Sequence, residues 1–202
     1  MFALKRSLYI VLLFFLYSCT QEEIVKSNSN FPLKAGNYWI YRTTFTSADG
    51  VVQVFPYLDS VWIQKDTLIN HKKYWKQIQS LSGTVYLRDS SDCLLMKKLT
   101  YEQIIFSTNR DTLLKTPPLY KLVTNVNEHT KVPAGEFITN DCRTLLRKGP
   151  LNTGFDAYFP SFGKDFYTAE HYLCSKNVGL VKNIYYYLGN TIEYELVRYK
   201  LK

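Results

Sequence analysis

The stretch Tyr38-Trp-Ile-Tyr-Arg-Thr-Thr-Phe-Thr46 decides the fold class. In an extended chain every second residue shares a face, so aromatic rings gather on one side: Trp39, Tyr41 and Phe45. Asp49-Gly50 follows and is a dipeptide strongly favoured in β-hairpin turns. Val51 to Phe55 is therefore predicted to be the returning strand, and Pro56 is expected to end it.

Further strand-like segments follow at intervals of roughly 8–12 residues, the spacing typical of an antiparallel sheet. They are residues 59–69, 73–81, 84–88, 93–99, 102–108, 120–126, 136–147, 183–188 and 191–201. Residues 164–174 fit a strand or a short helix. A change of apolar phase predicts a β-bulge near Leu196-Val197. Thr116-Pro117-Pro118 is expected to be a loop that crosses between two halves of the sheet.

The composition supports an all-β protein. Aromatic residues make up 16% of the chain, with 17 Tyr and 12 Phe, and such residues favour pleated, half-buried surfaces. No long segment keeps a helical period. The sequence predicts a mainly antiparallel, strongly curved sheet or half-barrel meander with at most one short helix. Residues 31–202 are expected to form it as a single domain.

Residues 1–18 have the pattern of an export signal. Lys5 and Arg6 precede an apolar run of about ten residues, which is shorter than the ~20 that a membrane-spanning helix requires. The run ends at Leu16-Tyr-Ser-Cys19, which resembles the bacterial lipobox. The resemblance implies cleavage before Cys19 and acylation of its thiol and amino group, palmitate included. An ordinary signal peptide or a signal anchor is the alternative.

Residues 19–30 are polar and predict a flexible tether between the lipid and the folded domain. Glu22-Glu23 resembles the surface-export signal of lipoproteins from Bacteroidetes-type bacteria, although a tether that is merely soluble explains it equally well. We therefore expect a bacterial cell envelope protein, lipid-anchored at the outer membrane, on its periplasmic or its surface side.

The formal net charge is +8 for the 202 residues and +6 once residues 1–19 are removed. Basic residues are scattered and form no run of five, so no nucleic-acid partner is predicted. Anionic glycans or lipid headgroups remain candidate partners. Three cysteines follow Cys19 in a compartment where disulfides persist. If residues 136–147 and 164–174 are neighbouring strands, a Cys142–Cys174 disulfide is favoured, with buried free thiols as the alternative. The third is Cys93.

Three blocks stand in order along residues 31–202: Phe31-Pro-Leu-Lys-Ala-Gly-Asn-Tyr-Trp-Ile-Tyr41, Val132-Pro-Ala-Gly-Glu-Phe137 and Asn177-Val-Gly-Leu-Val-Lys182. Together they resemble uncharacterised Bacteroidetes-type lipoproteins with GN-x-W-x-Y, VPAG-x-F and GxGLVK blocks. This chain has Asn177 where glycine is commoner. The resemblance implies a curved antiparallel sheet similar in outline to periplasmic lipoprotein carriers. It implies no activity, because the family has none that is agreed.

The sequence contains no recognisable catalytic, nucleotide-binding or metal-binding motif: no G-x-S-x-G, no G-x-x-x-x-G-K-[ST] and no H-E-x-x-H. The three histidines, including His171, are placed in turns or strand ends. We therefore expect no enzyme, no metal and no cofactor. A hydrolase without a recognisable motif is the remote alternative.

The function expected first is a non-enzymatic binding or scaffolding module for an apolar or lipid-like ligand in the concave side of the sheet. Its candidate lining is aromatic: Trp39, Tyr41, Trp62, Trp75, Tyr86, Phe137 and Tyr185. Ordinary core packing is the alternative for each ring. The second candidate is a surface lipoprotein that contacts a protein or glycan through the long irregular loop 148–163. That loop is rich in aromatic residues, which also fit a plug at the open end of the sheet.

Overall fold

The computed structural model describes residues 31–90, 93–107, 112–150 and 154–202, so the expected signal peptide, Cys19 and tether lie outside the described residues. The fold is all-β, as the sequence predicts. Thirteen described strands form one antiparallel sheet in the order β6-β5-β4-β3-β2-β1-β13-β12-β11-β9-β8-β7, with β10 paired to β11. None of the described residues forms a helix long and apolar enough to cross a membrane.

The strands are β1 (Tyr38–Thr46), β2 (Val52–Ile69), β3 (Lys72–Gln79), β4 (Gly83–Ser90), β5 (Cys93–Lys97), β6 (Glu102–Ser107), β7 (Thr112–Thr116), β8 (Leu119–Val132), β9 (Gly135–Arg147), β10 (Ser161–Phe162), β11 (Phe166–Ser175), β12 (Gly179–Tyr187) and β13 (Asn190–Lys200). A 3-10 turn, Phe155–Ala157, lies between β9 and β10.

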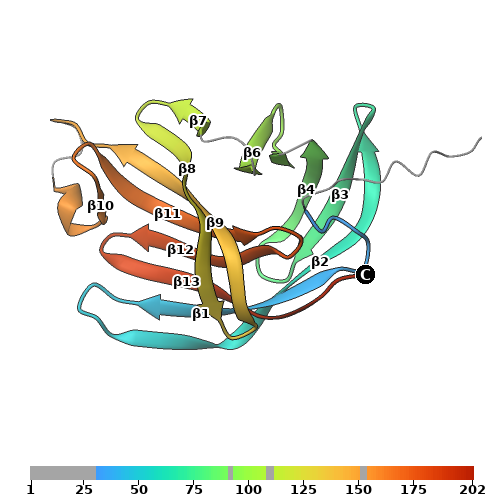
Figure 1. Cartoon of the computed structure of the whole chain (residues 1–202), viewed down its shortest axis with the longest axis horizontal. Helices are drawn as coiled ribbons and strands as arrows, with labels where there is room; N and C mark the ends of the chain where they lie inside the picture. Colours follow the sequence, from blue (N-terminus) through green and yellow to red (C-terminus); the bar gives the residue numbers. More distant parts are fainter. Residues whose placement is uncertain (1–30, 91–92, 108–111, 151–153) are drawn as a thin grey trace, which may run out of the picture.

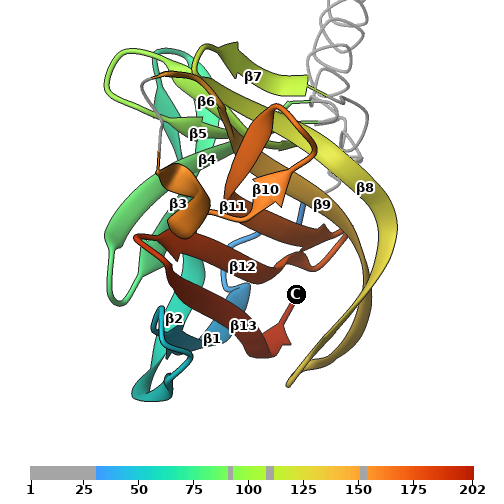
Figure 2. The same cartoon turned by 90° about the vertical axis from the view of Figure 1, so that its left-hand side faces the viewer.

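The sheet curves until its two end strands come near each other. Figures 1 and 2 both place β6 and β7 together at the top, with β1, β2 and β13 below. Phe106 of β6 and Leu113 of β7 belong to one buried cluster, into which Phe31 also packs. The rings of Phe31 and Phe106 meet edge to face at 5.3 Å. The strongly curved sheet predicted from the sequence is therefore a nearly closed barrel-like wall.

The hairpin predicted at Asp49-Gly50 is confirmed. Ser47 N donates to Val51 O at 3.0 Å, and Gly50 adopts a positive φ of 86°, which glycine accommodates without strain. The predicted alternation also holds at Trp39 and Tyr41, which are buried.

The prediction that Pro56 ends a strand is wrong. In β2, Leu58 pairs with Arg42 and Val54 pairs with Thr44, so residues 55–57 together oppose Thr43. Pro56 thus lies in a bulge of one continuous strand of 18 residues. A proline lacks the N–H that a regular ladder needs, and a bulge is one of the few interior positions that tolerates it.

Two ambiguous segments are settled by the register. Residues 166–175 form strand β11 and not a helix. Ile40 pairs with Arg198 and Tyr41 with Leu196, so Val197 is the extra residue of a bulge, as predicted. Thr116-Pro117-Pro118, in contrast, forms the turn of the β7–β8 hairpin and does not cross between halves of the sheet.

The long β8–β9 hairpin passes in front of β12 and β13 (Figure 1). At its tip, Ala134 N donates to Leu196 O at 3.0 Å. Val132 packs in a core cluster with Trp39 and Val181. At the opposite end of the sheet, Phe155 of the 148–163 segment contacts Tyr167, and Gly189 N donates to Tyr158 O at 3.3 Å. This segment therefore packs on the end of β11 and on the β12–β13 turn.

Candidate functional site

The curved sheet encloses a cavity of about 430 Å³. Its volume lies in the range of roughly 300–1,000 Å³ typical of small-molecule sites. The lining comes from β1 to β6, from β11 to β13 and from the chain segment before β1. The described lining residues are Phe31, Tyr41, Asp59, Val61, Gln77, Gln79, Leu81, Ser82, Val85, Leu87, Leu94, Met96, Ile105, Phe106, Tyr172, Cys174, Gly179, Leu180, Asn183 and Tyr194.

One wall of this cavity is aliphatic and is contributed by β4, β5 and β6. Val85 and Leu87 point inward from β4, and Met96 of β5 pairs with Leu87 in the adjacent strand. Leu81, which is 56% exposed, and Ser82 place the β3–β4 turn at the rim. Sequence reasoning missed this wall because it considered only aromatic residues. The alternation of Val85 and Leu87 with polar neighbours was the available signal.

The aromatic lining predicted from the sequence is not a single surface. Tyr41 alone of the seven lines this cavity. Trp75 lines a second cavity of about 430 Å³ beside Phe31 and Leu33. Trp39 is a core residue whose Nε1 donates to Val178 O at 2.7 Å, and Phe137 packs against the Tyr199 ring.

Strand phase explains Trp62 and Tyr86, whereas Tyr185 lies too near the end of its strand to reach the cavity. Val61 and Ile63 are buried, so Trp62 between them points to the opposite face of β2 and is 36% exposed. Tyr86 lies between the lining residues Val85 and Leu87 and likewise faces away from the cavity. Tyr185 is 41% exposed near the end of β12.

The cavity also has a polar region centred on Asp59, which is 7% exposed. Ser80 Oγ donates to Asp59 Oδ1 at 2.6 Å, and Leu81 N donates to the same oxygen at 3.3 Å. Asp59 is the one charged side chain among the described lining residues. Asn183 contributes a buried Oδ1 without a hydrogen-bond partner in the described structure, while its Nδ2 donates to Glu170.

The pKa values of two tyrosines in the cavity wall, Tyr41 and Tyr194, are raised in part by the nearby Asp59. Burial, followed by the nearby Cys174 and Asp59, raises the pKa of Tyr41 far above its ordinary value, and its hydroxyl donates to Leu180 O at 2.9 Å. Burial and Asp59 likewise raise the pKa of Tyr194. Both hydroxyls therefore remain neutral at physiological pH.

Cys142 and Cys174 are buried free thiols in the structure, as is Cys93, so the expected Cys142–Cys174 disulfide is not formed. The two strands are neighbours, as expected, but Cys142 pairs with Tyr172 and Cys174 pairs with Asn140. The two cysteines are thus diagonal and not opposite. Burial raises the pKa of the Cys142 thiol to about 12, which leaves it protonated and unreactive.

Lys121 of β8 is a buried cation next to this cluster, at 5% exposure. Its Nζ lies 4.0 Å from the centre of the Tyr172 ring. Burial lowers the pKa of Lys121, although the nearby carboxylate of Glu170 partly opposes that effect. Lys121 is not a lining residue of the cavity, because Tyr172 stands in the wall there.

A histidine–carboxylate pair lies elsewhere on the sheet. Arg143 Nε contacts Asp141 Oδ2 at 2.6 Å, and His171 Nδ1 lies 3.4 Å from Oδ1. Burial opposes ionisation of Asp141, but His171 and Arg143 outweigh it and hold its pKa below the usual range. His171 lies in the middle of strand β11, whereas the sequence predicted that it lies in a turn or at a strand end. None of these three lines the cavity, and the described residues contain no group of His, Cys, Asp and Glu suited to a metal.

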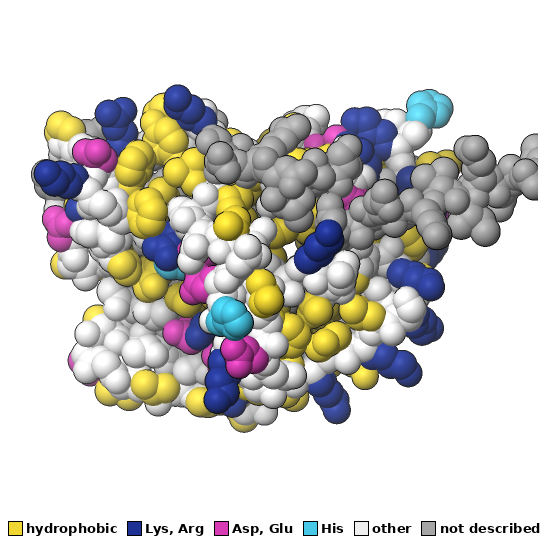
Figure 3. Space-filling model, viewed as in Figure 1, with side chains coloured by type: hydrophobic (Ala, Val, Ile, Leu, Met, Phe, Trp, Pro, Cys, Tyr) yellow, Lys and Arg dark blue, Asp and Glu magenta, His cyan; other side chains and the backbone are white. Residues whose placement is uncertain are grey.

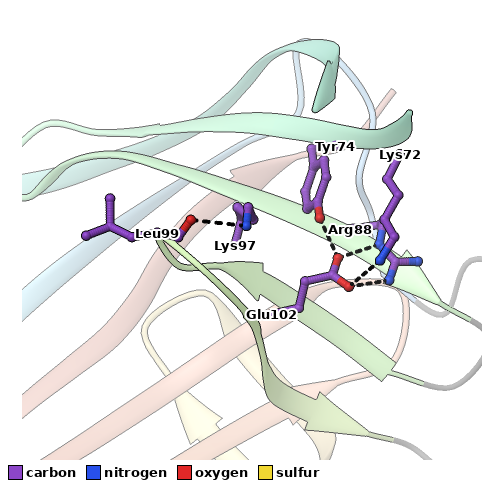
Figure 4. A network of polar contacts seen from close by, with 6 residues as sticks. All are labelled: Lys72, Tyr74, Arg88, Lys97, Leu99 and Glu102. Atoms are coloured by element: carbon purple, nitrogen blue, oxygen red, sulfur yellow. Dashed lines mark hydrogen bonds and ion pairs between the residues drawn. The ribbon is translucent and has the colours of Figure 1, made fainter. Parts of the chain in front are cut away.

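A second buried carboxylate, Glu102, is fully paired (Figure 4). It accepts hydrogen bonds from Arg88 Nε at 2.8 Å, Arg88 Nη2 at 2.9 Å, Tyr74 OH at 2.5 Å and Lys72 Nζ at 3.1 Å. The Arg88 and Tyr74 bonds, with that of Lys72, hold the pKa of Glu102 far below its usual range against the effect of burial. Arg88 follows Leu87 in β4, so this network occupies the face opposite the cavity.

Two of the solved structures that this chain is similar to are those of a "putative exported protein" and a "putative lipoprotein". One is the "putative exported protein with YmcC-like fold" of Bacteroides fragilis NCTC 9343, at 11% identity and a TM-score of 0.49, covering 84% of this chain and 98% of the other. The second is the "putative lipoprotein" of Parabacteroides distasonis ATCC 8503, at 14% identity and a TM-score of 0.49, covering 85% and 98%. No protein-family model matches the chain, and no curated protein does.

Proposed function

We propose that this chain is a lipid-anchored protein of the bacterial cell envelope, at the outer membrane, whose cavity binds an apolar or lipid-like ligand without catalysing a reaction. The observation that carries the proposal is the cavity of about 430 Å³ with its aliphatic wall on β4, β5 and β6. Such a wall gains free energy from any apolar group that displaces water from it.

The location follows from the N-terminal pattern. An acylated Cys19 would hold the domain at a membrane, where single-chain and double-chain amphiphiles are abundant. The polar residues 20–30 would allow the domain to reach them. On the face shown in Figure 3, basic side chains are spread over several elements and form no continuous patch.

Photolabelling of the full chain in phosphatidylcholine vesicles tests the proposal. The probe is a dodecyl alcohol with a diazirine at the end of its tail, and mass spectrometry locates the labelled residues. We expect labels on lining residues of β4 to β6. Val85→Trp should lower labelling there about tenfold by filling the cavity, equivalent to about 1.4 kcal/mol of binding. Thr84→Trp, the same substitution on the opposite face of β4, should leave it unchanged.

Two results would contradict ligand binding in the cavity. One is labelling confined to exposed surface residues, and the other is labelling of β4 to β6 that Val85→Trp does not reduce. Because overpacking costs roughly 1–3 kcal/mol, circular dichroism must show that Val85→Trp is folded. If Val85→Trp does not fold, the position of the label in the unmodified chain still shows whether the probe enters the cavity.

A second function, contact with an envelope protein or glycan, is favoured by the apolar end of the sheet. Tyr158 of the 148–163 loop is 42% exposed, and Leu188 on the neighbouring β12–β13 turn is 51% exposed. Val51 and Val52 extend this end at 62% exposure each. A photo-crosslinking residue at position 158 should capture one specific envelope partner if this function holds, and only scattered products if it does not.

A further inference from the structure

Asp59 differs from every other buried carboxylate described above because it has no cationic neighbour. Glu102 and Asp141 both lie within 3.1 Å of a Lys or Arg nitrogen. Within the described residues no Lys, Arg or His lies within ion-pair distance of Asp59, and none lines the cavity. A buried, unpaired charge is costly, and proteins normally compensate it.

The remaining hydrogen-bonding capacity near Asp59 accepts more than it donates. Ser80 and Leu81 donate to Oδ1, and Oδ2 has no hydrogen-bond partner among the described residues. Asn183 adds a second buried acceptor, Oδ1, on the same cavity wall. The Tyr41 hydroxyl is not available as a donor to a ligand, because it already donates to Leu180 O. Among the described lining residues there are neutral hydrogen-bond donors, such as the amides of Gln77 and Gln79, but no positive charge.

We propose that the cavity selects single-tailed amphiphiles with an ammonium head, the tail lying against the aliphatic wall of β4 to β6 and the head beside Asp59. An ammonium group supplies both the positive charge and an N–H donor for Asp59 Oδ2. A carboxylate head would place a second negative charge beside Asp59 in a water-poor site. This inference rests on the proposed function and specifies its ligand.

The other buried groups near the cavity do not supply the missing charge. Lys121 faces the ring of Tyr172 and has Glu170 as its acidic neighbour. Gln77 and Gln79 carry neutral amides, which can turn either their N–H or their oxygen toward a head group. The cavity volume of about 430 Å³, near the lower end of the usual range, suits one alkyl tail better than a two-chain phospholipid.

Competition against the same photoactivatable dodecyl alcohol tests the head-group preference on the full chain in phosphatidylcholine vesicles. The competitors share one tail and differ in the head: dodecylamine, dodecanol and dodecanoate. We expect dodecylamine to compete at least about tenfold better than dodecanoate, with dodecanol between them. Because the three partition differently into vesicles, each value is divided by the value for Asp59→Asn in the same vesicles.

Asp59→Asn should remove the advantage of dodecylamine at least about tenfold while labelling by the alcohol probe in the cavity persists. Asp66→Asn is the matched control: it makes the same change on the same strand, at a carboxylate that is exposed and paired with Lys73. It should leave all three competitors unchanged.

The outcomes separate this inference from the function on which it rests. Labelling inside the cavity with equal competition by amine and carboxylate, or an amine advantage that Asp59→Asn leaves intact, overturns the head-group inference alone. Labelling that never reaches the cavity residues overturns ligand binding itself. If Asp59→Asn does not fold, the series on the unmodified chain decides the head-group preference once each competitor's concentration is corrected for its measured partitioning into the vesicles.

Discussion

Glu102 and Asp59 are two largely buried carboxylates on opposite faces of the same half of the sheet, and their surroundings differ. Glu102 is surrounded by Arg88, Tyr74 and Lys72, which fill its acceptor positions. Asp59 receives hydrogen bonds from Ser80 and from the backbone of Leu81 only, and it borders a cavity. One carboxylate is satisfied within the protein, whereas the other is only partly satisfied.

The difference separates a structural role from a ligand-directed one. A charge paired by neighbouring strands stabilises the fold, because losing either side leaves the partners unpaired. A charge that lacks a cation destabilises the empty protein and becomes favourable when a ligand supplies the cation. Measurements of stability can therefore distinguish the two groups without any ligand.

The largest expected effect is that of Glu102→Gln. This substitution keeps the shape of the side chain but removes the charge that Arg88 and Lys72 pair with, leaving Arg88 without its bidentate partner. We expect it to lower the free energy of unfolding by about 2–3 kcal/mol. Urea unfolding followed by tryptophan fluorescence would measure it. A loss below about 0.5 kcal/mol would show that the network does not stabilise the sheet.

Acid should remove the same contribution. The pKa of Glu102 is lowered in the folded protein, so its stabilisation is complete above the unfolded value of about 4.3 and is lost as the pH falls through the folded value. The stability gap between the unmodified chain and Glu102→Gln should therefore be constant from pH 7 to about pH 5 and narrow below it. A gap that stays constant under strongly acidic conditions would contradict this assignment.

Asp59→Asn is expected to have a smaller effect, within about 1 kcal/mol of the unmodified chain when no ligand is present. The substitution weakens the hydrogen bond from Ser80, but it also removes an unpaired buried charge. The same urea unfolding measures it. A loss of unfolding free energy as large as that of Glu102→Gln would mean that Asp59, like Glu102, is satisfied by partners within the protein. Asp66→Asn should change stability least, by less than about 0.5 kcal/mol, because that ion pair is exposed.

Local rules predicted most of the fold. Alternating residues and turn dipeptides such as Asp49-Gly50 located nearly all strands, because both signals depend on neighbouring residues alone. The bulge at Val197 was also visible, as a change of apolar phase. The continuity of β2 through Pro56 was not, because it depends on pairing with Thr43 of another strand.

The cavity could be predicted only in outline. The antiparallel β sheet followed from the strand spacing and the composition, and its concave side from the family resemblance, but aromatic residues were taken as its lining without regard to strand phase. Trp62 and Tyr86 consequently face away from the cavity, while aliphatic residues such as Leu87 and Met96 form its wall. The role of Asp59 depends on the absence of a cation around it, which no single segment of sequence reveals.

The most direct test of ligand binding is mass spectrometry of the molecules that co-purify with the full chain from its native host. We expect one non-covalently bound amphiphile per chain, with a single tail and an ammonium head. This amphiphile should be lost in Val85→Trp and retained in Thr84→Trp. Recovery of the chain without any non-covalently bound molecule would contradict the assignment of the cavity as a ligand site.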